Sequence, residues 1–171
     1  LRGDPEDAAF LETVEGVLGA SLPTEPNTVV EGDGVGALWL GPDEWLLITP
    51  PSMEARLADG LRDALGDTFA AVTDVSGGQT VITIQGPHAR DVLAKGCSLD
   101  LHPRVFSPGQ CAQTLVASVG AIISQIDEKP SFDLIVRRSL AEYLAHWLED
   151  AAQEYGLEVV GDGGHVSQAT R

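Results

Sequence analysis

Histidine and cysteine, the residues that most often bind metals or act as nucleophiles, are few in this sequence and lie apart. No two histidines share an expected element at a metal-ligand spacing, and the cysteines do not form a Cys-x-x-Cys motif, so we predict no metal site. Cys97 and His102 have the residue types of a nucleophile and its base, but no activating motif surrounds them. We predict buried, reduced thiols, with a disulfide as the alternative. The residues considered are His88, His102, His146, His165, Cys97 and Cys111.

Motifs for phosphate binding and for acid–base chemistry are incomplete. The glycines of Gly32–Gly36 alternate as in a phosphate loop, but no helix follows to aim its amides at an anion, so we predict a turn. The acidic pairs Asp43-Glu44 and Asp127-Glu128 fall in expected turns, where water solvates them. Asp74 and Asp100 precede turns, where a carboxylate accepts backbone N–H bonds. We therefore predict no catalytic, cofactor-binding or metal-binding residue on this chain.

The elements that would position such groups alternate irregularly along the chain. Apolar spacing predicts helices over 5–20, 53–65, 87–95 and 139–155. Runs rich in β-branched and aromatic residues predict strands over 28–31, 37–40, 45–49, 79–85, 112–117, 121–126 and 132–136. Adjacent strands without helices between them argue against a doubly wound parallel sheet. We predict an α+β fold in a single domain, with mixed or antiparallel sheets and three to four helices.

Several residues indicate where these helices begin and end. Ser52 is expected to cap the second helix, and Gly66 to close it. Ser139 and Glu142 have the spacing of a capping box at the start of the last helix, and Gly156 is its expected C-cap. The expected apolar face of this helix comprises Leu140, Tyr143, Leu144, Trp147, Leu148 and Ala151.

Charge limits the class of partner. The 171 residues include 26 Asp and Glu against 10 Lys and Arg, which gives a formal net charge of −16. Because phosphate groups repel such a surface and no basic stripe offsets it, we predict no nucleic acid and no membrane as partner. The charge either serves solubility alone or meets a basic surface on another protein.

Length and composition are those of one globular domain. We assign it to residues 1–160 and expect a flexible C-terminal tail over 161–171. No apolar run reaches the roughly 18 residues that a membrane span requires, and the first residues lack a hydrophobic signal core. We therefore expect a cytoplasmic protein, and the initial leucine indicates a processed chain or a fragment.

Four sequence motifs, in their order and spacing, resemble the gamma subunit of heterotetrameric sarcosine oxidase. The resemblance covers roughly residues 30–155, most of the chain. The matching segments are Leu38–Leu47, Asp74–Thr80 continuing through Gly86–Ala89 to Lys95–Leu101, Phe106 with Pro108–Leu115, and Phe132–Leu134 together with the helix of Trp147.

The resemblance implies properties that composition does not show. Such gamma subunits resemble the N-terminal region of the folate-binding aminomethyltransferases of the glycine cleavage system, and that fold is implied here. The complex of alpha, beta, gamma and delta subunits oxidises sarcosine to glycine and hydrogen peroxide, and tetrahydrofolate takes up the methyl carbon as methylene-tetrahydrofolate. FAD, FMN and NAD are implied on alpha and beta, folate chemistry on alpha, and zinc on delta. No cofactor is implied on gamma.

One departure from the aminomethyltransferases supports a non-catalytic role. Those enzymes carry an Asp-Asp pair in a strand whose counterpart here, Gly120–Gln125, contains no carboxylate. Asp127 lies further along the chain. We therefore predict a structural gamma subunit, in which Trp39, Trp45 and Trp147 serve either as interface anchors or as core residues. The alternatives are a stand-alone folate-binding or aminomethyltransferase-like protein, and an unrelated acidic adaptor domain.

Overall fold

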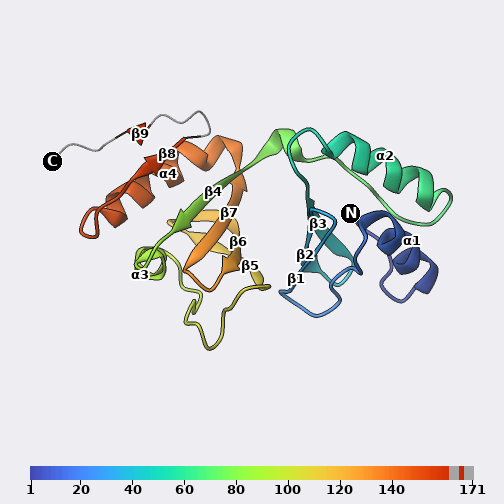
Figure 1. The fold of residues 1–171 in the computed structure, drawn as a ribbon, viewed down its shortest axis with the longest axis horizontal. Helices are drawn as coiled ribbons and strands as arrows, with labels where there is room; N and C mark the ends of the chain where they lie inside the picture. Colours follow the sequence, from blue (N-terminus) through green and yellow to red (C-terminus); the bar gives the residue numbers. More distant parts are fainter. Residues whose placement is uncertain (162–165, 168–171) are drawn as a thin grey trace.

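The computed structural model describes residues 1–161 and 166–167, which form two helix-and-sheet halves joined through their sheets (Figure 1). In the described residues the sheets are antiparallel throughout, as expected for an α+β fold. The seven strands and four helices predicted from the sequence are all present, with ends shifted by a few residues. The single-domain α+β prediction is therefore confirmed.

The first half places two helices over a three-stranded sheet of order β1-β2-β3. Its elements are α1 (Ala8–Leu18), β1 (Val29–Gly32), β2 (Val35–Gly41), β3 (Glu44–Ile48) and α2 (Glu54–Leu65). Asp7 caps α1 by accepting from the N–H groups of Ala9 and Phe10, and Gly19 ends the helix in the left-handed conformation. Buried Phe10, Leu61 and Trp45 bring α1, α2 and β3 into one apolar cluster.

The second half packs two helices against a four-stranded sheet of order β4-β7-β6-β5. Its elements are a 3₁₀ turn (Ser76–Gly78), β4 (Gln79–Gln85), α3 (Ala89–Ala94), β5 (Cys111–Val116), β6 (Val119–Asp127), β7 (Ser131–Arg137) and α4 (Arg138–Ala152). The core of this half includes Leu93 of α3, Ile123 of β6 and Leu144 of α4, all fully buried.

The two sheets meet through a smaller apolar cluster. Leu38 of β2 packs with Cys111, Ile122 and Ile135 of the second sheet. Backbone hydrogen bonds reinforce this junction, because the Cys111 N–H donates to the Asn27 carbonyl oxygen over 2.9 Å. The helices therefore lie on the outer sides and the sheets on the inner sides (Figure 1).

The helix starts differ from the sequence prediction. The N-cap of α2 is Met53, not Ser52, and it makes no side-chain capping bond. The predicted capping box of Ser139 and Glu142 is also wrong: α4 begins at Arg138, directly after Arg137 pairs with Gln79 in the sheet. Because the strand runs straight into the helix, Ser139 already lies in the first helical turn.

The buried face of α4 is narrower than predicted. Leu144, Leu148 and Ala152 are buried, whereas Tyr143 is 54% exposed. The Tyr143 hydroxyl donates to the Ala117 carbonyl oxygen over 3.0 Å, and this hydrogen bond links one side of α4 to the β5–β6 turn.

After α4, β8 (Val159–Val160) pairs with β9 (Val166–Ser167). The flexible tail predicted over 161–171 falls largely on 162–165 and 168–171, which lie outside the described residues. The tail and the domain boundary stay predictions. None of the helices formed by 1–161 combines the length and the apolar character needed to cross a membrane.

Candidate functional site

The three described histidines lie in different parts of the fold: before α3, in a loop and on α4. His88 stacks on Tyr155 with ring centroids 4.4 Å apart, and its Nδ1 lies 2.9 Å from Asp91 Oδ2 on the surface of α3. His102 Nδ1 accepts from a backbone N–H in a loop, and His146 is exposed. His165 lies outside the described residues. Among residues 1–161, no three metal-ligating side chains gather into a cluster.

The two cysteines are buried free thiols, as predicted, and their environments differ. Cys97 Sγ lies 3.8 Å from the Thr114 hydroxyl, and no contact with His102 joins the two as nucleophile and base within the described residues. Cys111 is buried at the junction of the two sheets, where its S–H points at the Thr28 and Trp39 carbonyl oxygens. Burial raises the pKa of the Cys111 thiol to about 11, so it stays protonated at neutral pH.

Asp74 and Asp100 have the structural roles expected of them. Asp74 accepts from the Ser76 backbone N–H over 2.8 Å, and Asp100 accepts from the His102 N–H over 2.9 Å. The Gly32–Gly36 segment includes the hairpin turn between β1 and β2. The solvated turn expected for Asp127 is wrong: the residue lies at the end of β6, where its Oδ1 is buried with no hydrogen-bond partner among the described residues.

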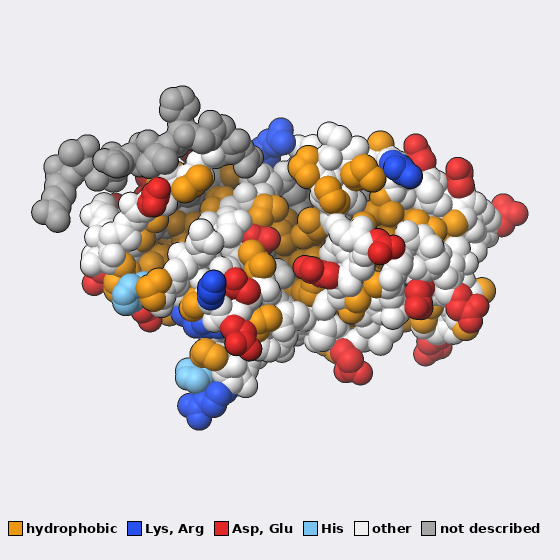
Figure 2. All heavy atoms as spheres, viewed as in Figure 1, with side chains coloured by type: hydrophobic (Ala, Val, Ile, Leu, Met, Phe, Trp, Pro, Cys, Tyr) orange, Lys and Arg blue, Asp and Glu red, His pale blue; other side chains and the backbone are white. Residues whose placement is uncertain are grey.

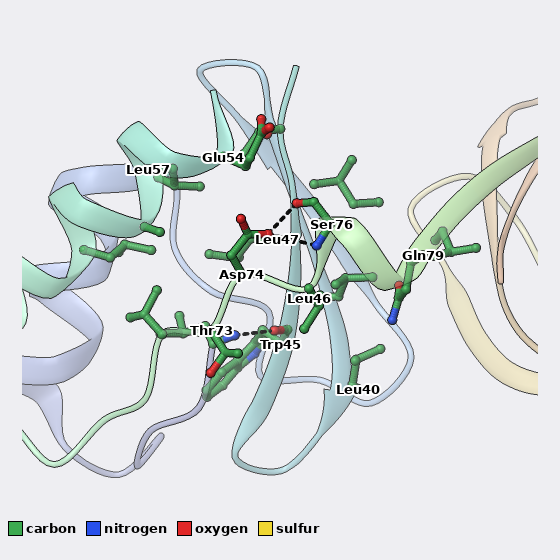
Figure 3. Close-up of a pocket in the computed structure, with 18 of the residues that line it drawn as sticks. Leu40, Trp45, Leu46, Leu47, Glu54, Leu57, Thr73, Asp74, Ser76 and Gln79 are labelled. Atoms are coloured by element: carbon green, nitrogen blue, oxygen red, sulfur yellow. Dashed lines mark hydrogen bonds between the residues drawn. The ribbon is translucent and has the colours of Figure 1, made fainter. Parts of the chain in front are cut away.

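A cleft of about 490 Å³ lies where the two halves meet. Its lining is mostly apolar and comes from both faces of β3, from α2, from the segment after α2 and from the start of β4 (Figure 3). Sequence analysis did not predict this cleft. The available signal was the unbroken apolar run Trp45–Ile48, which indicates a strand with both faces covered.

The floor of the cleft is fixed by buried packing beneath it. Trp45 is 1% exposed, its ring lies 5.9 Å from that of Phe10, and its indole Nε1–H donates to the Pro23 carbonyl oxygen over 2.7 Å. The next strand residues, Leu46 and Leu47, are half-buried and line the cleft. The strand edge is therefore held rigidly from one side while its apolar side chains reach the cleft.

Charged groups stand at the ends of this apolar lining. The Arg2 guanidinium lies 2.5 Å from the Glu44 carboxylate, a pairing that raises the pKa of Arg2. The Ser76 hydroxyl and backbone N–H both donate to Asp74, and these bonds lower the pKa of Asp74 (Figure 3). Glu54, in the first turn of α2, also lines the cleft. Asp74 is thus stabilised as an anion, and a carboxylate stabilised in this way is a weak general base.

On the face shown in Figure 2, acidic side chains spread over the half that carries α1 and α2. Apolar side chains reach the surface between the two halves in the same view. Among large apolar residues of the described part, Val81 is 46% exposed and Val75 is 44% exposed, and both line the cleft. The cleft thus presents apolar surface to solvent, as sites of association often do.

Known proteins share both the sequence and the architecture of this chain. The chain is 37% identical over 161 residues to the sarcosine oxidase subunit gamma of Corynebacterium sp. strain P-1, covering 94% of this chain and 77% of that one. A chain of the solved heterotetrameric sarcosine oxidase from Corynebacterium sp. U-96, in complex with pyrrole 2-carboxylate, superposes with a TM-score of 0.82 at 34% identity. That match covers 94% of this chain and 81% of the other.

A more distant similarity reaches the aminomethyltransferases. The aminomethyltransferase of Saccharopolyspora erythraea is 27% identical over 122 residues, which span 71% of this chain but only 33% of that enzyme. The family model described as sarcosine oxidase, gamma subunit family, matches residues 2–154. With its α+β architecture and these similarities, the chain belongs to the sarcosine oxidase gamma subunit family.

Proposed function

We propose that this chain is the gamma subunit of a heterotetrameric sarcosine oxidase, in which its role is to hold the assembly together. The observation that carries the proposal is the match to a chain of the solved heterotetrameric enzyme over 94% of this sequence, at a TM-score of 0.82. Complexes of this kind would oxidise sarcosine to glycine and hydrogen peroxide, with the methyl carbon passing to tetrahydrofolate.

We also propose that this chain contributes no catalytic residue. General acid–base catalysis needs a group whose pKa lies near the working pH. Hydrogen bonds from Ser76 move the pKa of Asp74, which lines the cleft, downward, away from neutrality. The strand segment Gly120–Gln125 brings no carboxylate to the second sheet. Asp74 and the segment Gly120–Gln125 therefore support a role in packing and docking, and not in catalysis.

The cofactors of the reaction would lie on the partner subunits. FAD, FMN and NAD would belong to alpha and beta, tetrahydrofolate to alpha, and zinc to delta. The glycine-rich segment Gly32–Gly36 supports this assignment, because it connects two antiparallel strands rather than a strand and a helix. We place the complex in the cytoplasm, consistent with two buried cysteines that remain free thiols.

A stand-alone folate-binding or aminomethyltransferase-like protein is not favoured. The aminomethyltransferase match covers one third of that enzyme, whereas the gamma subunit match covers about three quarters of its relative. The higher identity likewise belongs to the gamma subunit.

Co-production with the alpha, beta and delta subunits of the same organism tests the proposal. We expect this chain to co-elute on size exclusion with a yellow complex that forms peroxide from sarcosine. Omission of this chain should lower the yield of intact complex. If the three other subunits assemble and turn over sarcosine equally well without it, the structural role is wrong, and folate binding by the isolated chain becomes the next measurement.

A further inference from the structure

Phe69, in the loop between α2 and the 3₁₀ turn, is an aromatic residue in full contact with solvent. It is 98% exposed, whereas Val160, the next most exposed large apolar residue of the described part, is 70% exposed. Phe69 does not line the cleft. The antiparallel pairing of Arg2 with Ala71 directs the chain before Leu1 toward residue 73, away from Phe69. The whole apolar surface of this ring is therefore available to a partner.

The loop that carries Phe69 is held by backbone hydrogen bonds on both sides. Before Phe69, the Thr68 N–H donates to the Leu65 carbonyl oxygen over 2.9 Å. After it, Ala71 and Arg2 exchange two backbone hydrogen bonds, each 2.9 Å long. The backbone of this loop is thus fixed before any partner binds, and a contact that is already in position loses less conformational entropy on binding.

Two aspartates beside this loop contradict the usual charge preference of a helix end. Asp63 lies in the last turn of α2 and Asp67 lies just beyond it, where the helix dipole is negative and favours cations. Both are exposed, and neither forms an ion pair within residues 1–161. Arg62, the base of this turn, pairs with Asp59 instead. Residues that break such local rules at a cost to stability are expected at functional sites.

The end of α2 belongs to the more acidic half of the molecule. Residues 1–75 contain 15 Asp and Glu against 3 Lys and Arg, so they carry −12 of the formal net charge of −16. On the face shown in Figure 2, acidic side chains spread over this half. Such a surface repels a second copy of the same chain and attracts a partner whose surface is basic.

We propose that Phe69, Asp63 and Asp67 dock on another subunit of the complex, at an apolar pocket bordered by lysine or arginine. Phe69 enters the pocket, and the two aspartates meet the cations at its rim. A protein is favoured over a small ligand, because Phe69 stands out from the surface and small ligands bind in concave sites. Aromatic side chains that fill a partner's pocket are typical interface hot spots. The inference rests on the proposed function, which supplies the partner subunits.

Hydroxyl-radical footprinting of the isolated chain and of the co-produced complex tests the position of the contact. Phe69 should be among the most strongly oxidised residues of the isolated chain and should be protected in the complex. Protection of other residues, with Phe69 oxidised as before, would overturn the inference and leave the subunit assignment intact. A Phe69 already protected in the isolated chain would overturn the inference as well. Absence of any association with the partner subunits would overturn both proposals.

Matched substitutions test the aromatic contact. Phe69→Ser removes the ring, Phe69→Trp keeps an aromatic side chain, and Val105→Ser alters an exposed apolar residue of the second half, 55% exposed. We expect Phe69→Ser to weaken association with the partner subunits by about tenfold or more, since 1.4 kcal/mol corresponds to tenfold in affinity. Phe69→Trp should lose less, and Val105→Ser should lose nothing. The urea midpoint of isolated Phe69→Ser should stay unchanged. Equal effects of Phe69→Ser and Val105→Ser on association would contradict the proposed contact.

A pair of charge reversals tests the acidic rim. Asp63→Lys and Glu149→Lys each place a cation in the exposed last turn of a helix, α2 or α4. Because the helix dipole favours a cation there, both variants should raise the urea midpoint of the isolated chain. Only Asp63→Lys should slow association, by about tenfold at low salt, and the difference should shrink as salt screens the charge. If both variants associate at the same rate, the aspartates make no contact with a basic partner.

Discussion

At the scale of single residues, Trp45 links the core of the first half to the cleft. Its ring is buried against Phe10, and its indole N–H satisfies the buried Pro23 carbonyl oxygen over 2.7 Å. The following residues of the same strand line the cleft. Trp45 is therefore a core residue, whereas Trp39 is half-buried and Trp147 packs partly buried against the core of the second half.

Trp45→Phe should destabilise the chain mainly through the lost hydrogen bond. Phenylalanine keeps most of the apolar contact but leaves the Pro23 carbonyl oxygen unpaired, which costs about 1–3 kcal/mol. The free energy of unfolding in urea measures the loss. Trp39→Phe is the control, because the Trp39 indole N–H makes no hydrogen bond to the described residues. Equal losses of unfolding free energy in the two variants would show that the hydrogen bond to the Pro23 carbonyl oxygen makes no particular contribution to stability.

Cys111 should make stability depend on pH in the alkaline range. Its pKa is raised by burial from 9.0 in the unfolded chain to about 11 in the folded one. Below pH 9 the thiol is protonated in both states, so its contribution is constant. Between pH 9 and about 11 only the unfolded chain loses the proton, and the free energy of unfolding falls by about 1.4 kcal/mol per pH unit.

Urea unfolding across this range, compared with Cys111→Ala, isolates the contribution of the thiol. The variant should be less stable than the wild-type chain at neutral pH because it loses packing, but it should lack the additional fall above pH 9. Parallel profiles for the two proteins would show that the Cys111 thiol ionises equally well in the folded chain.

At the scale of elements, one glycine sets how closely α4 approaches the turn that follows α3. A Cβ built on Gly96, which follows α3, would lie 2.5 Å from ring atoms of Trp147 and 3.2 Å from the Ala117 backbone nitrogen. Gly96→Ala should therefore cost about 1–3 kcal/mol of unfolding free energy through overpacking, and it should alter Trp147 fluorescence. Gly16→Ala is the matched change inside α1: nothing lies within 4 Å of its Cβ. It should stabilise by up to about 1 kcal/mol.

Periodicity in the sequence predicted the strands and helices because each pattern is local. Residues such as Leu61 and Leu65 recur at helical spacing and bury one face of α2 as expected. Helix starts were predicted less well, because they depend on tertiary context. Ser139 does not cap α4, because Arg137 still pairs in the sheet and the helix begins at Arg138. The cleft depends on how β3 and β4 meet, and these strands belong to different sheets. No local pattern encodes such a meeting.

At the scale of the whole molecule, three apolar clusters hold the two halves together. Each half has its own core, and the cluster of Leu38, Cys111, Ile122 and Ile135 joins them. The cleft lies beside this junction, since Ile135 contributes both to the shared cluster and to the cleft lining.

The net charge of −16 should make the isolated chain more stable in salt. The described residues form four ion pairs, which leaves most of the 26 acids without a cation. Raising NaCl from about 10 mM to about 1 M shortens the Debye length from about 30 Å to about 3 Å and so screens repulsion between acids. Each kcal/mol gained raises Tm by about 2–4 °C in a chain of this size. Thermal scans should show the gain at pH 7 and a smaller one near pH 5, where the charge is lower. A Tm that falls with salt at both pH values would mean that the ion pairs outweigh the repulsion, and that the charge need not be balanced by a partner.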